Sequence, residues 1–226
     1  MEEHIVSSPS TESPVPGDGA SLSSMTLAGL MARRVLWRCQ SQSVWGSGGV
    51  ATGIAALDAV LPLRGWPASA LSEVLLPAPG MLELQLLWPL LARLTQAGAR
   101  VVLIAPPFVP CATAWQQAGV VLSRLEIVEA DASGQAVWAF EQCLRSGSCA
   151  AVVGWPAIRG ELTLRRLQVA AHHGQSLGVA LRAACHAAEP SPAALRLQIL
   201  SDGRLKVLKC RGGAVPGQCV SLPPAI

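Results

Sequence analysis

The chain has 226 residues, of which 51% are apolar and 14% are charged, and its formal net charge is +3. That length and apolar content suffice for one domain with a sizeable core, whereas so small a net charge does not by itself indicate a nucleic-acid-binding protein. No uncharged apolar run approaches the ~20 residues that a membrane-spanning helix needs, so we expect buried surface or a partner interface and no membrane association.

The N-terminal segment is predicted to be disordered. Residues 1–25 are rich in Glu, Ser, Pro and Gly, carry few large apolar side chains, and lack the basic and apolar regions of a signal peptide. Thr26 could cap a helix that extends to residue 37 and carries an apolar stripe with a basic edge. We expect a disordered tail over residues 1–25, one domain over residues 26–212 and a C-terminal tail over residues 213–226.

The segment 52–88 organises the rest of the chain. Thr52 could cap a short helix through residue 57, Gly and Pro residues make a turn at 65–67, and residues 70–76 predict a buried strand. After a loop that contains Pro and Gly, leucines recur at helical spacing between residues 82 and 94. A strand, a loop and a helix in this order form the frame in which a nucleotide phosphate loop would sit.

The loop itself lacks the groups that hold phosphates. A Walker-type loop needs Gly-rich backbone, a Lys for the β- and γ-phosphates and a Ser or Thr hydroxyl for Mg²⁺. Here the loop contains Pro77 and Gly80 but no Lys or hydroxyl, and Glu83 stands about where the Lys would be. Replacing that cation by an anion reverses an interaction of roughly 4 kcal/mol at 4 Å, which the ~0.3–1 kcal/mol from a helix N-terminus does not offset. Pro77, Gly80 and Glu83 therefore predict a degenerate nucleotide loop.

Strands and helices alternate through the rest of the domain. Apolar runs and helical spacing predict strands over residues 100–105, 125–128, 149–153 and 177–182, and helices over residues 112–118, 136–145 and 162–172. Residues 194–200 and 204–209 alternate in polarity around a turn at 201–203, which predicts a hairpin. The pattern predicts an α/β fold with a mostly parallel sheet flanked by helices and a C-terminal β-hairpin.

No catalytic or metal-binding constellation is apparent in the sequence. The seven cysteines are odd in number and include no Cys-x-x-Cys pair, which favours buried, reduced thiols and a cytoplasmic protein. None of the histidines lies at metal-ligand spacing with carboxylates. Asp58 and Glu73 are isolated carboxylates, which we interpret as cap or surface charges. We expect no enzymatic activity, no cofactor and no bound metal.

The last third of the chain contains the candidate binding residues. Basic side chains gather on the helix over residues 162–172 and on the hairpin, and they are Arg165, Arg166, Arg204, Lys206, Lys209 and Arg211. They could contact nucleic acid or an acidic partner, or they could be an ordinary solvated face. No aromatic residue follows residue 190 to stack a base. The segment after Gly212 has too few apolar residues for a core of its own, so we expect it to dock on a partner, the alternative being an edge strand over residues 218–222.

Several of these segments together resemble the ImuA family, RecA-like accessory proteins of damage-inducible mutagenic translesion synthesis whose relatives include the cell-division inhibitor SulA. The resemblance extends over about residues 37–212. The residues that carry it are Thr52-Gly53, Leu57-Asp58, Gly65-Trp66-Pro67, Ser72-Glu73-Val74, Ala105-Pro106-Pro107 and the segments 137–147, 164–168, 191–197 and 208–212.

The resemblance implies a RecA-like fold without ATPase chemistry. Where ATPases of that superfamily place a carboxylate after the strand at residues 103–104, this chain has Ala105-Pro106. Where they end the next strand with a metal-organising Asp, it has Gly154-Trp155. With the missing Lys, three requirements of ATP hydrolysis fail together.

The resemblance also implies a function and its partners. The expected function is that of a non-catalytic adaptor in SOS-induced mutagenic translesion DNA synthesis and DNA damage tolerance. The expected partners are an inactive, ImuB-like Y-family polymerase homologue and a C-family DNA polymerase, with weak non-specific DNA binding, self-association or contact with RecA as further options. Two alternatives remain, a SulA-like cell-division inhibitor that binds FtsZ and a diverged RecA-like ATPase. Residues 165–168 and 209–212 favour the adaptor over the inhibitor.

Overall fold

The structure of the protein is a computed structural model that describes residues 48–80, 82–130 and 133–222. These residues all belong to one unit, which spans residues 39–226. The tail predicted over residues 1–25 and the helix predicted over residues 26–37 lie outside the described part of the chain.

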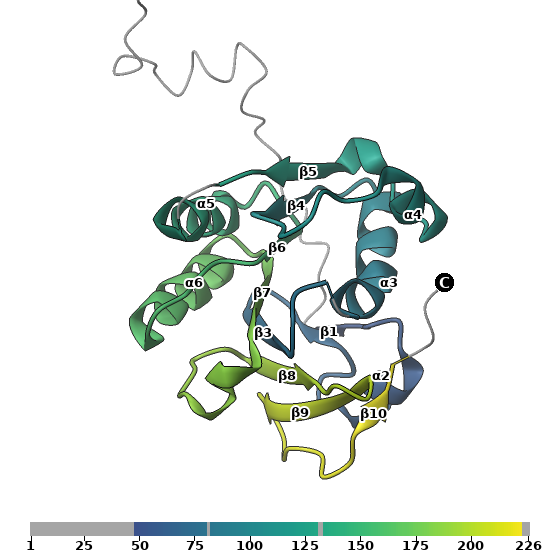
Figure 1. Cartoon of the computed structure of the whole chain (residues 1–226), viewed down its shortest axis with the longest axis vertical. Helices are drawn as coiled ribbons and strands as arrows, with labels where there is room; N and C mark the ends of the chain where they lie inside the picture. The colour runs from purple at the N-terminus through teal and green to yellow at the C-terminus, as the bar shows by residue number, and fades with distance from the viewer. Residues whose placement is uncertain (1–47, 81, 131–132, 223–226) are drawn as a thin grey trace, which may run out of the picture. The chain divides into compact units, whose positions relative to one another are not determined.

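An eight-stranded sheet forms the centre of this unit (Figure 1). Its strands, in spatial order, are β10 (Val220–Ser221), β9 (Arg204–Cys210), β8 (Leu195–Ile199), β3 (Leu71–Leu76), β7 (Leu177–Ala183), β6 (Ala151–Gly154), β4 (Val101–Ile104) and β5 (Leu125–Val128). The six strands from β8 to β5 are parallel, whereas β9 and β10 are antiparallel to their neighbours. The mostly parallel sheet predicted from the sequence is therefore present, with the hairpin as one of its edges.

Helices cover both faces of the sheet because the buried strand residues alternate between two cores. Val74 and Leu103 pack with α2 (Ala55–Val60), α3 (Glu83–Gln96) and α4 (Ala112–Gln117) on one face. Leu71 and Ile104 pack with α5 (Ser133–Ser146) and α6 (Glu161–His173) on the other. Short 3-10 turns, η2 (Leu122–Arg124) and η3 (Ala184–Ala188), precede β5 and follow β7. Strands buried on both faces explain the near-continuous apolar runs of the sequence.

The start of α2 differs from the prediction. Thr52 does not cap the helix, because α2 begins at Ala55 and its N-cap position is Ile54. Thr52 is instead buried, and its Oγ1 accepts a hydrogen bond from the Ile54 N–H at 3.0 Å. The Asp58 carboxylate accepts a hydrogen bond from the Thr52 N–H at 2.8 Å, so the two side chains fix the turn that leads into α2. A two-stranded ribbon, β1 (Gly49–Val50) with β2 (Trp66–Pro67), brackets this helix.

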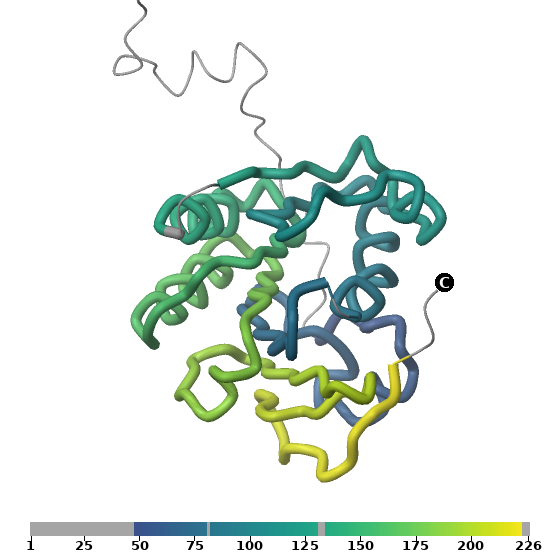
Figure 2. The backbone as a smooth tube through the Cα atoms, in the orientation of Figure 1, coloured from purple at the N-terminus to yellow at the C-terminus, as the bar shows by residue number. Residues whose placement is uncertain are grey.

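The C-terminal segment also differs from the predicted docking arm. Val220 lies in the apolar core and belongs to β10, which pairs with β9 in register with Leu205. The edge-strand alternative is therefore the one that the structure contains. The backbone trace follows β8, β9 and β10 at the end of the sheet that lies away from β5 (Figure 2).

The register of the parallel strands brings their carboxyl ends to one edge. Leu76 of β3 aligns with Ala183 of β7, and Ile104 of β4 aligns with both Gly154 of β6 and Val128 of β5. The loops that follow these strands therefore emerge side by side. Ligands of open α/β sheets bind outside the carboxyl ends of the strands, so this edge is the first place to look for a site.

Candidate functional site at the carboxyl edge of the sheet

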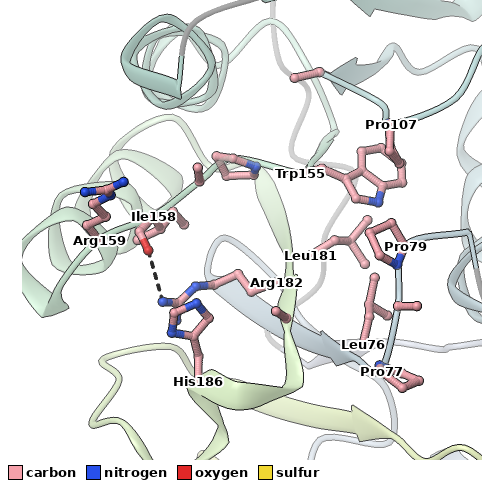
Figure 3. Close-up of a pocket in the computed structure, with 15 residues that line it drawn as sticks. Leu76, Pro77, Pro79, Pro107, Trp155, Ile158, Arg159, Leu181, Arg182 and His186 are labelled. Atoms are coloured by element: carbon pink, nitrogen blue, oxygen red, sulfur yellow. Dashed lines mark hydrogen bonds between the residues drawn. The ribbon is translucent and has the colours of Figure 1, made fainter.

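A cavity of about 460 Å³ opens at this edge. Residues 76–79 after β3 line one side, residues 155–159 after β6 line the other, and the end of β7 with His186 of η3 closes the base. Figure 3 shows Pro77 and Pro79 across the cavity from Ile158 and Arg159. The cavity therefore lies next to the loop that the sequence identifies as a degenerate phosphate loop.

Glu83 is buried against the backbone of the loop between β3 and α3. Its side chain is 1% exposed, and its Oε1 accepts a hydrogen bond from the Gly80 N–H at 2.6 Å. Gly80 adopts a φ of +83°, which points this N–H at the carboxylate. A phosphate in the loop would lose the N–H and meet a buried anion, a repulsion of roughly 4 kcal/mol at 4 Å. Pro77 is exposed at the rim of the cavity.

The two other positions at which RecA-like ATPases would place acidic groups hold Gly154 and Ala105. A Cβ added to Gly154 would lie 3.2 Å from the Ile104 Cβ, so a side chain there would require the neighbouring strand to shift by a few tenths of an ångström. Trp155 follows, and its backbone N–H donates to the Ile104 carbonyl at 3.1 Å. Ala105, with a φ of 48°, turns the chain directly into Pro106 after β4. Neither loop of this edge provides a carboxylate at these positions.

A buried ion-pair cluster lies beside the cavity, and the sequence interpretation of its carboxylate is wrong. Glu73 is completely buried on β3 and is neither a cap nor a surface charge. Arg182 Nη1 of β7 donates to its Oε1 at 2.6 Å, and Arg196 Nε of β8 donates to its Oε2 at 2.8 Å. A signal was present in the sequence, since a charged residue inside a continuously apolar strand has to find partners on neighbouring strands.

The two arginines of this cluster donate hydrogen bonds to segments that line the cavity or lie next to it. Arg196 donates to the carbonyl oxygens of His186, Ala187 and Glu189, at 2.9, 3.2 and 3.0 Å, and so fixes η3. Arg182 donates to the Ile158 carbonyl at 3.2 Å and to the Glu189 carboxylate at 3.3 Å. Arg182 lines the cavity, but its donors are directed at this chain's own oxygens. It acts as a structural cation and is not a free phosphate ligand.

The Glu189 carboxylate closes the same network at the surface. A hydrogen bond with His186, at 2.8 Å from Nδ1, is the largest of the causes that lower the pKa of Glu189, and the contact with Arg182 adds to it. The ionised form is therefore the one that the fold favours.

The structure places the predicted basic residues on two separate elements. Arg165 and Arg166 lie exposed on α6, where Arg165 pairs with Glu161 at 3.1 Å and Arg166 pairs with Glu141 of α5. Arg204, Lys206 and Lys209 lie on β9, and Arg211 directly follows it; β9 is next to the edge strand β10 of the sheet. These six side chains therefore do not form one continuous basic site.

The basic residues of the hairpin are partly engaged within the chain. Arg204 pairs with Asp202 at 2.7 Å, and Lys209 Nζ donates to the Ser191 carbonyl at 2.6 Å. Lys206 and Arg211 are exposed, and within the described part of the chain neither has a recorded side-chain hydrogen bond or ion pair. The register puts Lys206 opposite Gln198 and Lys209 opposite Arg196, so both lysines lie on the sheet face that carries the Glu73 cluster.

The cysteines are more exposed than predicted. Cys111, Cys185 and Cys219 are exposed, and Cys149 alone among the described cysteines is buried. Burial, with a smaller contribution from Cys149, raises the pKa of the Cys143 thiol to about 12. Across residues 48–80, 82–130 and 133–222, no cluster of His, Cys, Asp and Glu could hold a metal ion. In the same ranges no helix is long and apolar enough to cross a membrane.

Large apolar side chains are exposed in several parts of the chain, and two of these parts bear on binding. Phe108 and Val109, in the loop after β4, are 65% and 94% exposed. Trp138 of α5 is 63% exposed, and Leu162 and Val169 of α6 are exposed as well. Contiguous exposed apolar surface marks interaction sites. The helical spacing could have identified these helix residues, because none lies on the face that buries Phe140 or Leu167.

Two comparisons with known proteins found a match for part of this chain. Residues 70–178 match the family model described as cell division inhibitor SulA. Among solved structures, the crystal structure of SulA from Pseudomonas aeruginosa is 29% identical, with 52% of this chain and 99% of that chain covered and a TM-score of 0.43. The comparison with curated proteins gave no match.

The match to the SulA family model corrects the functional hypothesis drawn from the ImuA resemblance. The family-level similarity is to a cell-division inhibitor and not to ImuA. A role as a translesion-synthesis adaptor, and the polymerase homologues expected as its partners, are therefore wrong. The alternative of a SulA-like inhibitor is the one that the match favours.

Proposed function

We propose that the protein is a SulA-like inhibitor of cell division that binds FtsZ and carries out no catalysis of its own. The observation that carries this proposal is the match of residues 70–178 to the family model of the cell-division inhibitor. This segment extends from the end of the turn before β3 to the start of β7, so it contains the degenerate loop and the helices α3 to α6. Induction by DNA damage, in an SOS-type response, belongs to the same proposal.

The chemistry of the carboxyl edge supports a binding role. Glu83 accepts the Gly80 N–H, which a phosphate in the loop would need, and Arg182 donates to Glu73, Ile158 and Glu189. What the segment offers to other molecules is exposed apolar surface, which is characteristic of protein-binding surfaces.

The α5–α6 surface is the part of this segment that we propose as the FtsZ contact. Arg166 of α6 pairs with Glu141 of α5, which fixes the two helices side by side. Trp138 precedes Glu141 by three residues and Leu162 precedes Arg166 by four, so each lies one turn before the ion pair on the surface of its helix. A large, exposed aromatic residue beside an aliphatic one is the composition of an interface anchor.

The proposal is tested by adding the purified chain to FtsZ with GTP and measuring polymer by sedimentation. We expect the wild-type chain to reduce the sedimented polymer, and the double variant W138A/L162A to need about 10-fold more protein for the same reduction, which is roughly 1.4 kcal/mol of binding. V215A is the matched control, because Val215 is an exposed apolar residue outside residues 70–178.

The possible outcomes separate the function from the surface. If the folded wild-type chain at excess leaves FtsZ polymer unchanged, the proposed function is wrong. If the wild type inhibits and W138A/L162A inhibits equally well, the function stands and the contact lies elsewhere. A loss of inhibition in V215A as large as in the double variant would also place the contact outside α5 and α6.

A further inference from the structure

A second cavity, of about 250 Å³, lies between α3, α4 and the loop after β4. Trp88, Trp115, Trp155 and Phe108 contribute aromatic rings to its otherwise mainly aliphatic and proline walls, and Glu83 provides a carboxylate. Trp88 and Trp115 meet edge to face, with ring centroids 6.5 Å apart and planes at 85°. Two indoles held at a right angle present a ring face and a ring edge to the same space.

The polar groups of this cavity are incompletely satisfied. Glu83 Oε1 accepts the Gly80 N–H, but within the described residues Glu83 Oε2 is buried without a hydrogen-bond donor. The indole N–H groups of Trp88 and Trp155 are also buried without an acceptor in the same part of the chain. Buried polar atoms are nearly always paired. One unpaired acceptor and two unpaired donors belong to residues that line one cavity, so a ligand that reaches these atoms through a small shift of the side chains would provide the missing partners.

The size and charge of the cavity restrict that ligand. Sites for cofactors and drug-sized molecules occupy about 300–1,000 Å³, so this cavity is of the size of a single side chain. The buried carboxylate oxygen requires a donor, and aromatic walls attract cations over their faces, with a planar guanidinium stacking best. Indole N–H groups require acceptors, which the carbonyl oxygens of a peptide backbone provide. A peptide segment with a basic residue meets all three requirements.

The mouth of the cavity has apolar surface for the rest of such a segment. Phe108 lies over the loop after β3, where a Cβ added to Gly80 would come within 2.7 Å of Phe108 Cε2. Val109 follows at the surface and is almost fully exposed. These two side chains form a rim on which residues next to the inserted one can pack.

We propose that this cavity is a recognition pocket for one basic side chain, preferably arginine, on an exposed segment of a partner protein. Glu83 Oε2 accepts from the guanidinium, and Trp88, Trp115 and Trp155 enclose it. The proposal goes beyond the inhibition of FtsZ and holds whichever partner carries the segment, because it depends on the cavity alone.

The test uses the full chain labelled with ¹⁵N, and it follows the indole N–H signals of Trp88 and Trp155, assigned with W88F and W155F. The probe is N-acetyl-arginine N-methylamide, and the neutral probe is the corresponding citrulline compound, which has nearly the same shape. We expect both signals to shift in a saturable way with the arginine probe, and the citrulline probe to bind at least 10-fold more weakly. A dissociation constant on the order of 1–10 mM is expected for so small a ligand.

The variant E83Q isolates the carboxylate. Its amide oxygen can still accept the Gly80 N–H, so the loop should fold, which a melting curve checks. We expect E83Q to bind the arginine probe at least 10-fold more weakly, and E161Q, which alters an exposed carboxylate on α6, to bind it like the wild type. Equal binding of arginine and citrulline by the wild type would overturn the proposal without reference to any variant. The absence of a shift at about 50 mM probe would also overturn it, whether the cavity is empty or filled by residues of the chain itself.

Discussion

Glu73 and Glu83 show that two glutamates in neighbouring elements have different roles because their partners differ. Glu73 meets two arginines, so its charge is compensated by Arg182 and Arg196. Glu83 meets one backbone N–H, and its second oxygen has no donor in the described part of the chain. The first carboxylate ties three strands together, and the second is available for a ligand. This difference depends entirely on which atoms the fold brings within hydrogen-bonding distance.

Removing the Glu73 carboxylate should destabilise the protein strongly. In the described part of the chain, E73A leaves the buried Arg196 without a carboxylate partner and leaves Arg182 with Glu189 alone, which costs roughly 3–5 kcal/mol. E161A is the matched control, because it breaks an exposed pair on α6 that is worth about 0.3–0.5 kcal/mol. Urea unfolding measures both free energies. A value for E73A within about 1 kcal/mol of the wild type would contradict the structural role of the cluster.

The Glu189 carboxylate should make the stability of the η3 region depend on pH. Its pKa is lowered in the folded state, first by the hydrogen bond with His186 and then by Arg182. A lowered pKa means that the ionised carboxylate stabilises the fold, fully above the pKa of the unfolded chain and progressively less as the pH falls.

We therefore expect E189Q to melt at a lower temperature than the wild type at pH 7. The difference should shrink as the pH falls below the ordinary carboxyl value of about 4.3, and it should vanish once the pH is below the lowered pKa of the folded state, because the wild-type carboxylate is then protonated as well. Melting curves at a series of pH values measure this difference, and titrations common to both proteins cancel. A gap that is constant or widens toward acid would show that the ionised carboxylate does not stabilise the fold.

At the scale of elements, the edge strand β10 converts the C-terminal segment from a free arm into part of the sheet. Val220 is 6% exposed and packs in the core of the α3 face, whereas nearby Val215 is 48% exposed. Sequence periodicity could not reveal this packing, because β10 has only two residues. A strand this short gains its stability from the neighbouring strand β9 and not from its own pattern.

Truncation of Val220 should therefore lower the stability of the whole unit. V220A removes two buried methyl groups, which costs roughly 1–2 kcal/mol, whereas V215A should stay within about 0.5 kcal/mol of the wild type. Denaturant unfolding of the two variants gives the comparison. Equal, negligible effects would show that β10 contributes nothing to the core.

The helices α5 and α6 show how packing leaves some apolar residues for other uses. The helices predicted over residues 136–145 and 162–172 lie within a few residues of α5 and α6, and Phe140 and Leu144 are buried on the inner side of α5. Trp138 lies off that side and remains exposed. The amphipathic pattern therefore identified the inner face of α5. Only the structure shows that α6 packs beside α5, so that the exposed Trp138 belongs to a surface formed by both helices.

For the molecule as a whole, the arrangement of the carboxyl edge predicts that nucleotides do not bind. Calorimetric titration with Mg·ATP should give no binding isotherm, because Glu83 occupies the loop and Arg182 is engaged by Glu73. E83K tests the same point in the opposite direction, since restoring a cation without the missing glycines and hydroxyl should not restore binding. A stoichiometric, micromolar isotherm with the wild-type chain would contradict this prediction.

The sequence alone determined the order and type of most elements. The strand β3, the loop and α3 follow from a buried apolar run and from leucines at helical spacing, and alternation of strands with helices predicted a mostly parallel sheet. Such local patterns depend only on residues that are close in the sequence, so they can be recognised without knowledge of the fold. The absence of a Lys and a hydroxyl from the loop can also be recognised from the sequence alone, because phosphate binding of the Walker type needs these residue types at these positions.

Only the tertiary structure decided which side chains meet. Glu73 lies 109 positions before Arg182 and 123 before Arg196, and the parallel register of β7, β3 and β8 brings the three together. The second cavity likewise joins Trp88, Trp115 and Trp155 from α3, α4 and the loop after β6. Burial and hydrogen bonding act through distance in space, which a linear pattern does not contain. For this reason the sequence showed only that Glu83 stands about where a phosphate loop would have a Lys. The structure shows that its carboxylate is buried beside the aromatic residues of the second cavity.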